Sequence, residues 1–430
     1  ETERPISPEM EFHQYPLRLA IDGEGIWIQA ISREFRRLLG GRLVAIDDHS
    51  AAKVVELVSP TIERDNEMQV LHHLPMHLVL PELLHARRVT KSADRASFRI
   101  EMRDGSVETV VLHRAPDETA IEWVETGPAE AGSVSLLHRR NDENFWFTHL
   151  ESSRLVYLQF NTVYDKEEET IRQFSERLTE FLKEVPQATL VIDLRHNRGG
   201  NQSLALPLLH AVIASPQNLS GQLFTIIGRT TFSAAMNFSL QMEKHTQTLF
   251  VGEPTGSKPN HYGDSRKTLL PNSNVTLRIS SLYWQWHPTD SRSWIVPHVE
   301  APLTLEAVLA DEDPALQVIE SVIATVVPPE VDGAWKGNLP PASFGLDSVL
   351  RLDSRSGPLQ GSVDIPPFGV DGVSVGNLEV EEATISFQIL IGSETLSYQA
   401  RMNDRWIVGQ GDLGSVRFPI LLEHSTIRAP

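Results

Sequence analysis

The stretch LFTIIGRTTFSAAMNFSLQMEKH, residues 223 to 245, joins two kinds of local structure. Its first six residues, LFTIIG, form an apolar run typical of a strand, and residues 233 to 245 follow a pattern typical of a helix. Ser233 stands at the junction. A serine in that position is expected either to cap the helix or to serve as a nucleophile held at the mouth of the strand.

Strand-like and helix-like segments alternate on both sides of this stretch. Strands are predicted at RLVYLQF (154 to 160), at the continuous apolar run TLVIDL (189 to 194) and at TLFVG (248 to 252). Helices are predicted at 166 to 185, where apolar residues recur every three or four positions, and at LALPLLHAVIA (204 to 214). This alternation, with short connections, predicts an α/β core with a mostly parallel sheet covered by helices.

The predicted core spans residues 131 to 328, and the two regions that flank it have different patterns of predicted secondary structure. Residues 1 to 130 combine short strands with a helical insertion at about 60 to 92. An Asp-Gly pair at 104 to 105 predicts a hairpin turn there, because glycine supplies the positive φ that the turn needs. Residues 329 to 430 follow strand patterns throughout and predict a small antiparallel barrel or sandwich.

Composition limits the classes of function. The chain has 430 residues and a net charge of −19, which argues against nucleic acid or an anionic membrane surface as a partner. It has no cysteine, so thiol nucleophiles, disulfides and Cys-based metal sites are excluded. No apolar run is long enough to predict a membrane-spanning segment. The start ETERPISPEM fits a mature exported protein, periplasmic or extracellular, or a trimmed chain.

Residues that could take part in catalysis or binding follow three of the predicted strands. RHNRGGNQS comes after TLVIDL, RTTFSAA after LFTIIG, and EPTGSKPNHYGD after TLFVG. Ligands of an open parallel sheet bind beyond the carboxyl ends of its strands. A glycine pair, a serine and a lysine are therefore predicted at one edge of one sheet. Each also has a structural interpretation: a tight turn, a helix cap and an exposed side chain.

The chemistry that unites these residues is acyl transfer. A serine hydroxyl is a poor nucleophile until a neighbouring base takes its proton. The backbone N–H of Ala234, and a second N–H from the Gly199-Gly200 turn, are predicted to form an oxyanion hole. Lys258 is the candidate base, provided that burial keeps it neutral.

At these residues the middle of the chain, roughly 145 to 325, resembles the C-terminal processing (tail-specific) peptidases and their tricorn-core relatives. That family has a strand ending Asp-Leu-Arg-x-Asn-x-Gly-Gly, which here is DLRHNRGG (193 to 200). It has a serine in a Ser-Ala context, here TFSAA, and a Val-Gly-Glu-x-Thr segment followed by Gly-Lys, here VGEPTGSK. Its general-base lysine lies 25 positions after the serine, as Lys258 lies 25 after Ser233.

The resemblance implies a serine endopeptidase acting on unfolded or C-terminal polypeptide segments, with no cofactor and no metal. Ser233 would be the nucleophile, Lys258 the general base, and Ala234 with Gly199 or Gly200 the oxyanion donors. It also implies a ClpP/crotonase-like core, preceded by a PDZ-like domain that binds peptide ends by strand addition.

Two positions depart from the family pattern. Tyr262 stands where the processing peptidases often have a glutamine that orients the lysine, and Gln159 stands where the tricorn relatives have a histidine. The segment EPTGSKPNHYGD is closer to a distinct bacterial branch, in which His261 is an alternative base. These departures leave open a second hypothesis, a peptide-binding protein that uses the same scaffold without catalysis.

A third hypothesis is a metalloenzyme that uses the histidines of LHHLPMH, namely His72, His73 and His77. The segment lacks the HExxH spacing that puts two ligands and a base on one helix face. The peptidase is therefore the favoured prediction.

Overall fold

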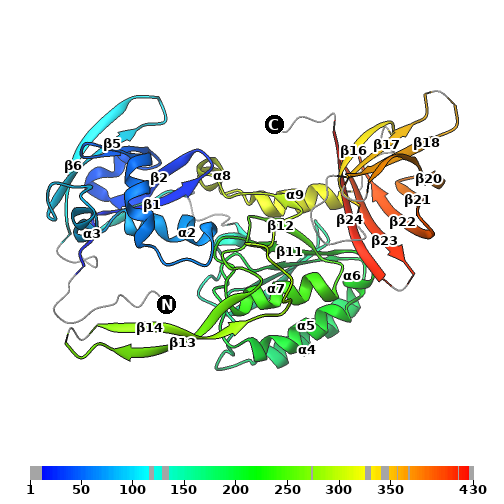
Figure 1. The fold of residues 1–430 in the computed structure, drawn as a ribbon, viewed down its shortest axis with the longest axis horizontal. Coiled ribbons are helices and arrows are strands. Elements are labelled where there is room, and N and C mark those ends of the chain that lie inside the picture. Colours follow the sequence, from blue (N-terminus) through cyan, green and yellow to red (C-terminus); the bar gives the residue numbers. More distant parts are fainter. Residues whose placement is uncertain are drawn as a thin grey trace. The chain divides into compact units, whose positions relative to one another are not determined.

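The computed structural model describes residues 12–115, 121–127, 135–272, 275–324, 331–339, 348–355, 357–366, 369–414 and 416–425. Figure 1 shows its elements. The chain forms two compact units. Unit 1 holds the described residues of Glu1–Arg140, Pro254–Ile295 and Pro302–Pro314, and unit 2 holds those of Asn141–Glu253, Val296–Ala301 and Ala315–Pro430. The predicted boundaries at about 130 and 328 stay predictions.

Unit 1 is built on an antiparallel sheet in the order β1-β2-β3-β5-β6, with β4 paired to β3 and β7 to β2. The strands are β1 Leu17–Asp22, β2 Gly25–Ser32, β3 Arg42–Ile46, β4 His49–Ser50, β5 Arg95–Glu101, β6 Val107–His113 and β7 Trp123–Glu125. The predicted hairpin is confirmed as β5-β6, and Gly105 in its turn has a φ of +81°.

Three helices that pack on this sheet follow β4 and precede β5 in the chain, and two of them fall in the segment predicted to be helical. They are α1 Ala51–Val58, α2 Glu67–His77 and α3 Pro81–Ala86. Val58 and Leu74 from these helices are fully buried in one apolar cluster with Phe98 of β5, whose ring meets Tyr15 edge-on at 5.1 Å. A later helix, α8 Leu305–Ala310, packs Leu305 against Trp27 of β2 in the same unit.

Unit 1 also contains a two-stranded antiparallel hairpin that the sequence patterns did not predict. Its strands are β13 His261–Leu269 and β14 Thr276–Trp284. Almost all of their residues are exposed on both faces, so no alternation of buried and exposed positions marks them.

The main sheet of unit 2 has the order β15-β12-β11-β10-β9-β8. Its strands are β8 Phe145–Leu150, β9 Leu155–Phe160, β10 Thr189–Asp193, β11 Leu223–Ile227, β12 Leu249–Gly252 and β15 Val299–Glu300. Only the β8-β9 pair is antiparallel, which confirms the mostly parallel sheet. Every residue of β9, β10, β11 and β12 is buried, as expected for strands covered on both faces.

Helices lie along this sheet (Figure 1). They are α4 Ile171–Glu184, α5 Leu206–Ile213, α6 Pro216–Leu219 and α7 Ala234–His245. The helix predicted at 166 to 185 begins only at Ile171, because Thr170 and Gln173 form a reciprocal capping box that fixes its first turn. None of the helices in the described part of the chain is long and apolar enough to cross a membrane.

The last part of unit 2 is an antiparallel sheet in the order β19-β18-β17-β16-β24-β23-β22-β21-β20, nearly closed into a barrel. Its strands are β16 Gly333–Asn338, β17 Ser348–Asp353, β18 Gln360–Ile365, β19 Val370–Ser374, β20 Gly376–Glu381, β21 Thr384–Ile391, β22 Glu394–Met402, β23 Trp406–Leu413 and β24 Val416–His424. Helix α9 Pro314–Ile323 precedes it, and Asn403 donates to the carbonyls of Ser321 and Ala324 at the end of that helix. The predicted all-β tail is confirmed.

Candidate active site

Ser233 occupies the N-cap position of α7 but does not act as a cap. Its φ and ψ are +55° and −121°, and its side chain makes no hydrogen bond to the helix start. A positive φ is uncommon for a residue with a Cβ, and such strain persists only where the surrounding structure enforces it. A sharp, strained strand-to-helix turn is also the setting that exposes the nucleophile serine of α/β-hydrolases. Among the residues that the structure describes, the partly exposed Ser233 hydroxyl has no hydrogen-bond partner.

The glycine pair lies directly beside this serine. A Cβ added to Gly199 would come within 2.8 Å of Ser233 Cβ and 2.9 Å of the Ala234 nitrogen. Gly199 and Gly200 have φ values of +105° and +139°, which other residues rarely adopt. The close approach and the backbone conformation both require glycine at position 199.

The hydrogen bonds of the turn distinguish the two glycines. The Gly199 N–H donates to Asn197 Oδ1 at 2.8 Å, so it is already occupied. In the parallel bridge between Val163 and Gly200, Val163 donates to the Gly199 carbonyl and Asn201 donates to the Val163 carbonyl. This leaves the N–H of Gly200 without a partner among the described residues. The N–H of Ala234, at the first position of α7, likewise has no partner among them.

Asn197 joins the three segments of this edge. It is fully buried, and its Nδ2 donates to the carbonyl of Phe160 at the end of β9 at 2.7 Å. Its Oδ1 accepts from Gly199, and its own carbonyl accepts from the N–H of Phe232, the residue before the serine, at 3.1 Å. One residue, through its side chain and its backbone carbonyl, therefore connects the end of β9, the glycine turn and the serine turn.

Thr231 fixes the other side of the serine turn. It is fully buried, its hydroxyl donates to the carbonyl of Leu194 at 3.0 Å, and the same oxygen accepts from the N–H of Gly228 at 3.0 Å. Sequence reasoning did not single out Thr231 or Asn197. The signal for Asn197 was its place two residues before Gly199, where an asparagine side chain can accept from the backbone.

Asp193 anchors the first residues after β10. It is buried, with Oδ2 accepting from Tyr157 Oη at 2.6 Å and from Arg195 Nη2 at 2.6 Å. Burial alone would raise the pKa of Asp193, but the Arg195 guanidinium and these hydrogen bonds outweigh it and hold the pKa below its usual range. Asp193 is therefore a charged structural anchor of the turn.

Lys258 and His261 belong to unit 1, whereas Ser233, Ala234, Gly199 and Gly200 belong to unit 2. Lys258 is held through its backbone, because its N–H donates to Asp65 Oδ2 at 2.6 Å. His261 is buried, and its Nδ1 lies 3.0 Å from the Lys258 carbonyl. Burial is the largest influence on His261 and lowers its pKa, so the imidazole is neutral at pH 7.

The segment before Lys258 is anchored by the residues that begin α2. Asp65 Oδ2 also accepts from the hydroxyl of Ser257 at 2.9 Å. Asn66 caps α2 and donates from Nδ2 to the carbonyls of Thr255 and Ser293 at 2.9 and 2.8 Å. Sequence reasoning missed both anchors, because they lie about 190 residues from the loop they hold.

The two positions that depart from the family pattern have different surroundings. Gln159 on β9 is fully buried, and its Oε1 accepts from Trp146 Nε1 at 2.7 Å. Tyr262 on β13 is 67% exposed and pairs with the ring of Tyr283 at 4.8 Å. Gln159 is thus a buried hydrogen-bonding group, and Tyr262 is part of the exposed hairpin.

The three histidines of LHHLPMH all lie in α2. The rings of His72 and His73 meet edge-on at 4.7 Å. No group of three or more His, Asp or Glu residues suited to hold a metal is found in the part of the chain that the structure describes.

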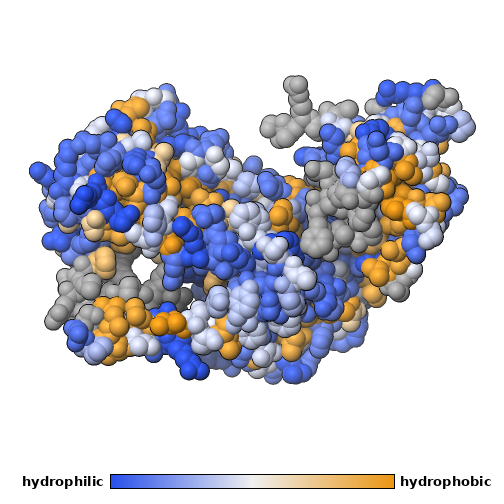
Figure 2. Space-filling model, viewed as in Figure 1, coloured by the Kyte–Doolittle hydropathy of each residue, from blue (hydrophilic) through white to orange (hydrophobic). Residues whose placement is uncertain are grey.

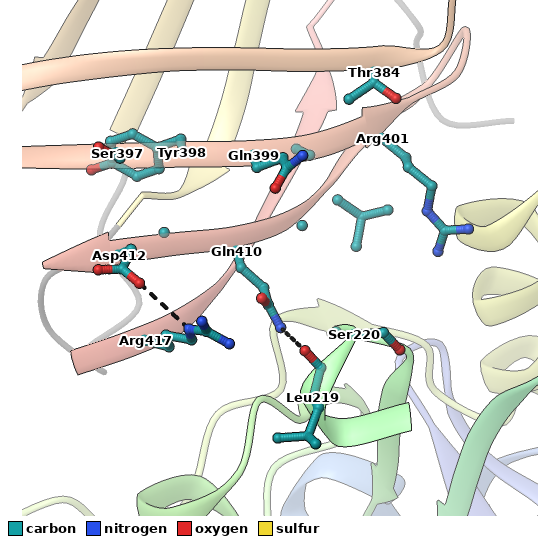
Figure 3. A pocket seen from close by; sticks show the side chains of 15 residues that line it. Leu219, Ser220, Thr384, Ser397, Tyr398, Gln399, Arg401, Gln410, Asp412 and Arg417 are labelled. Carbon is teal, nitrogen blue, oxygen red and sulfur yellow. Dashed lines mark hydrogen bonds and ion pairs between the residues drawn. The ribbon is translucent and has the colours of Figure 1, made fainter. Parts of the chain in front are cut away.

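A cleft with a volume of about 710 Å³ lies elsewhere on unit 2 (Figure 3). It lies between the outer face of β22 and β23 and the segment Leu219 to Gly221, where Gln410 Nε2 donates to the Leu219 carbonyl at 3.5 Å. That segment directly precedes β11, so the cleft lies at the amino end of this strand, whereas Ser233 follows its carboxyl end. The cleft is separate from the serine turn.

Comparison with known proteins finds similarity to solved structures alone. No protein-family model matches the chain, and no curated protein matches it. Mature CPAF complexed with lactacystin is 11% identical, with a TM-score of 0.49 over 72% of this chain and 82% of that one. The photosystem II D1 C-terminal processing protease is 13% identical (TM-score 0.32, 73% and 77%), and tricorn protease is 12% identical (TM-score 0.30, 72% and 28%). At these values the neighbours do not decide what this chain does.

Proposed function

We propose that this chain is a serine-type peptidase that hydrolyses polypeptides through an acyl-enzyme on Ser233. The observation that carries the proposal is the backbone conformation of Ser233, a residue with positive φ at the start of α7. Its hydroxyl does not cap the helix and lies beside the glycine turn. A helix cap needs no such strain, because N-cap residues ordinarily adopt extended φ and ψ. The strained conformation favours the nucleophile over the cap.

The oxyanion hole is proposed to consist of the N–H groups of Ala234 and Gly200. Both lack partners among the described residues, and the Gly199 backbone packs against the Ser233-Ala234 peptide. Gly199 serves instead as the residue whose missing side chain permits that approach. Two fixed N–H donors stabilise the negative charge that develops on the carbonyl oxygen when the hydroxyl attacks it.

The general base is proposed to be Lys258, on the strength of its 25-residue spacing from Ser233 and of the family resemblance. It would take the hydroxyl proton as Ser233 attacks and return a proton to the leaving amine. His261 is the alternative, supported by a buried imidazole that stays neutral at pH 7. The same resemblance is the basis for proposing polypeptide substrates with unfolded or C-terminal segments, a PDZ-like role for residues 1 to 130 and a ClpP/crotonase-like class for the core.

Cleavage of an unstructured protein tests the proposal. We expect Ser233→Ala to abolish turnover of casein, and the variant to keep the wild-type thermal unfolding temperature. Ser203→Ala is the matched control, since Ser203 is an exposed serine near the same glycine turn. Unchanged turnover by Ser233→Ala would sink the assignment. If the wild-type chain binds casein peptides in calorimetry without cutting them, the non-catalytic hypothesis replaces it.

A further inference from the structure

The exposed hairpin β13-β14 concentrates apolar surface to an unusual degree. Of the seventeen large hydrophobic residues that are exposed in the described chain, eight lie between positions 262 and 286. They are Tyr262, Leu269, Leu270, Leu277, Ile279, Leu282, Tyr283 and Trp286. Figure 2 shows apolar residues gathered on this ribbon. Soluble monomers rarely leave so much contiguous apolar surface in water, so a partner is expected to cover it.

One face of the hairpin carries the most ordered part of this surface. Residues directly opposite each other in an antiparallel ladder share a face, and the register pairs Tyr262 with Tyr283, Arg266 with Ile279 and Thr268 with Leu277. The ring centroids of Tyr262 and Tyr283 are 4.8 Å apart. We call the apolar members of this face, Tyr262, Leu277, Ile279 and Tyr283, the ribbon face. All four are between 40% and 67% exposed.

The hairpin also needs a partner for its own stability. A two-stranded ribbon with both faces in water is marginal at best, because it buries too little apolar surface to offset the ordering of its backbone. Strands β13 and β14 have nine residues each, and nearly all of them are exposed.

The exposed area matches what a dimer requires. A half-exposed aromatic or large aliphatic side chain offers about 100 Å², so the four side chains of the ribbon face offer about 400 Å². If two copies cover each other's ribbon face, each copy contributes its own ribbon face and the surface that receives the partner's, together about 800 Å², the share that each partner contributes to an interface of standard size.

Charge selects the partner. The hairpin strands carry Arg266 on the ribbon face and the cross-strand pair Lys267 and Arg278 on the opposite face. Asp264 is their single acid, so the strands are basic within a chain of net charge −19. The net charge of a second copy is strongly negative and attracts such a ribbon, whereas an anionic bilayer would repel the rest of the chain.

We propose that the hairpin is an exchanged arm: two copies of this chain associate by each laying its ribbon face on the other copy. The exchange is reciprocal, so the assembly closes as a twofold dimer, the commonest symmetry of homo-oligomers. The proposal does not depend on the catalytic assignment.

Mass measurement in solution tests the proposal. At about 10 to 50 μM, we expect the wild-type protein to elute as a dimer in size-exclusion chromatography with light scattering. The combined variant Leu277→Ser, Ile279→Ser, Tyr283→Ser should elute as a monomer, because its dimer dissociation constant is raised at least about 100-fold. The matched control is Val107→Ser with Val111→Ser, two exposed apolar residues on β6 of the same unit, which should remain dimeric. Far-UV circular dichroism verifies that both variants fold.

Salt and a site-specific label sharpen the outcome. Raising NaCl from 0.05 to about 0.5 M should weaken the dimer if charge selects the partner, because exposed charges are screened. The chain has no cysteine, so Thr268→Cys can carry a single polarity-sensitive fluorophore on the same face of the hairpin. Its emission should shift to the blue as protein concentration rises. A monomeric wild type at all these concentrations overturns the proposal, and so does a dimer that the hairpin variant leaves intact. Binding to phosphatidylglycerol vesicles by a monomeric wild type would assign the ribbon to a membrane instead.

Discussion

The turn that carries Ser233 and the loop that carries Lys258 follow neighbouring strands of one sheet, yet they are held in different ways. The serine turn is fixed by fully buried side chains of its own unit, Asn197 and Thr231, that bond only to backbone atoms of the same sheet edge. The lysine loop is fixed by Asp65 and Asn66, which lie about 190 residues before it in the sequence. The nucleophile therefore rests on local geometry, and the candidate base on a long-range anchor.

The largest expected effect comes from the lysine loop. Removing a general base costs roughly 10²- to 10⁴-fold in rate, so we expect Lys258→Ala to lower kcat on casein-derived peptides by that factor. Lys267→Ala is the control, because Lys267 is an exposed lysine on β13. If Lys258→Ala keeps wild-type kcat while His261→Ala loses it, the base is His261 and the spacing argument for Lys258 is wrong.

The next effect comes from the serine turn. We expect Gly199→Ala to reduce kcat/KM about 10²- to 10³-fold, because the added Cβ would approach Ser233 Cβ to 2.8 Å and displace the oxyanion donors. Gly105→Ala is a matched control: Gly105 also has a positive φ, of +81°, but nothing lies within 4 Å of an added Cβ. Equal losses of activity in the two variants would show that general instability, and not the serine turn, is responsible.

A smaller effect should follow from loosening the anchor of the lysine loop. Asp65→Ala removes the acceptor for Lys258 N–H and for the Ser257 hydroxyl, and we expect kcat to fall about tenfold with KM little changed. Asp65→Asn keeps an oxygen acceptor and should restore most of the rate, as measured by steady-state kinetics. If both variants match the wild type, the anchor has no part in catalysis.

The smallest expected effect is a difference in how the local stability of the lysine loop and of the glycine turn depends on pH. Burial lowers the pKa of His261 from 6.5, so its stabilising contribution is full above pH 6.5 and is lost as pH falls through the lowered value. The lowered pKa of Asp193 preserves its contribution down to about its unfolded value of 3.8. We therefore expect hydrogen-exchange protection at residues 255 to 261, but not at 193 to 200, to fall between pH 7 and pH 5.

Protection factors corrected for intrinsic exchange give this measurement, and His261→Gln should flatten the pH dependence of the lysine loop. Protection that falls equally in both segments would remove the distinction between them.

The same contrast explains what the sequence could predict. Strands β9 to β12 and helices α4 and α7 follow from apolar runs and periodicity, and the carboxyl-edge rule then brings Gly199 and Ser233 to one place. The choice of Gly200 over Gly199 as a free donor could not be predicted, because it depends on which N–H the Asn197 side chain takes. The positive φ of Ser233 could not be predicted either, since no local sequence signal requires it.

Hairpin β13-β14 escaped prediction for another reason. Its strands are exposed on both faces, so burial imposed no period-two pattern on them. The Asp65 and Asn66 anchors left no local signal either, since a hydrogen bond between distant segments needs only one polar side chain in each.

Direct detection of an acyl-enzyme tests the central claim, that Ser233 is the nucleophile. The chain would be mixed with a p-nitrophenyl ester of a short peptide, quenched in acid within milliseconds to seconds, and analysed by intact-mass and peptide mass spectrometry. We predict an acyl adduct on the peptide that contains Ser233, absent from Ser233→Ala and present in Ser203→Ala. Steady release of product with an adduct on another residue, or with the same adduct in Ser233→Ala, would contradict the account.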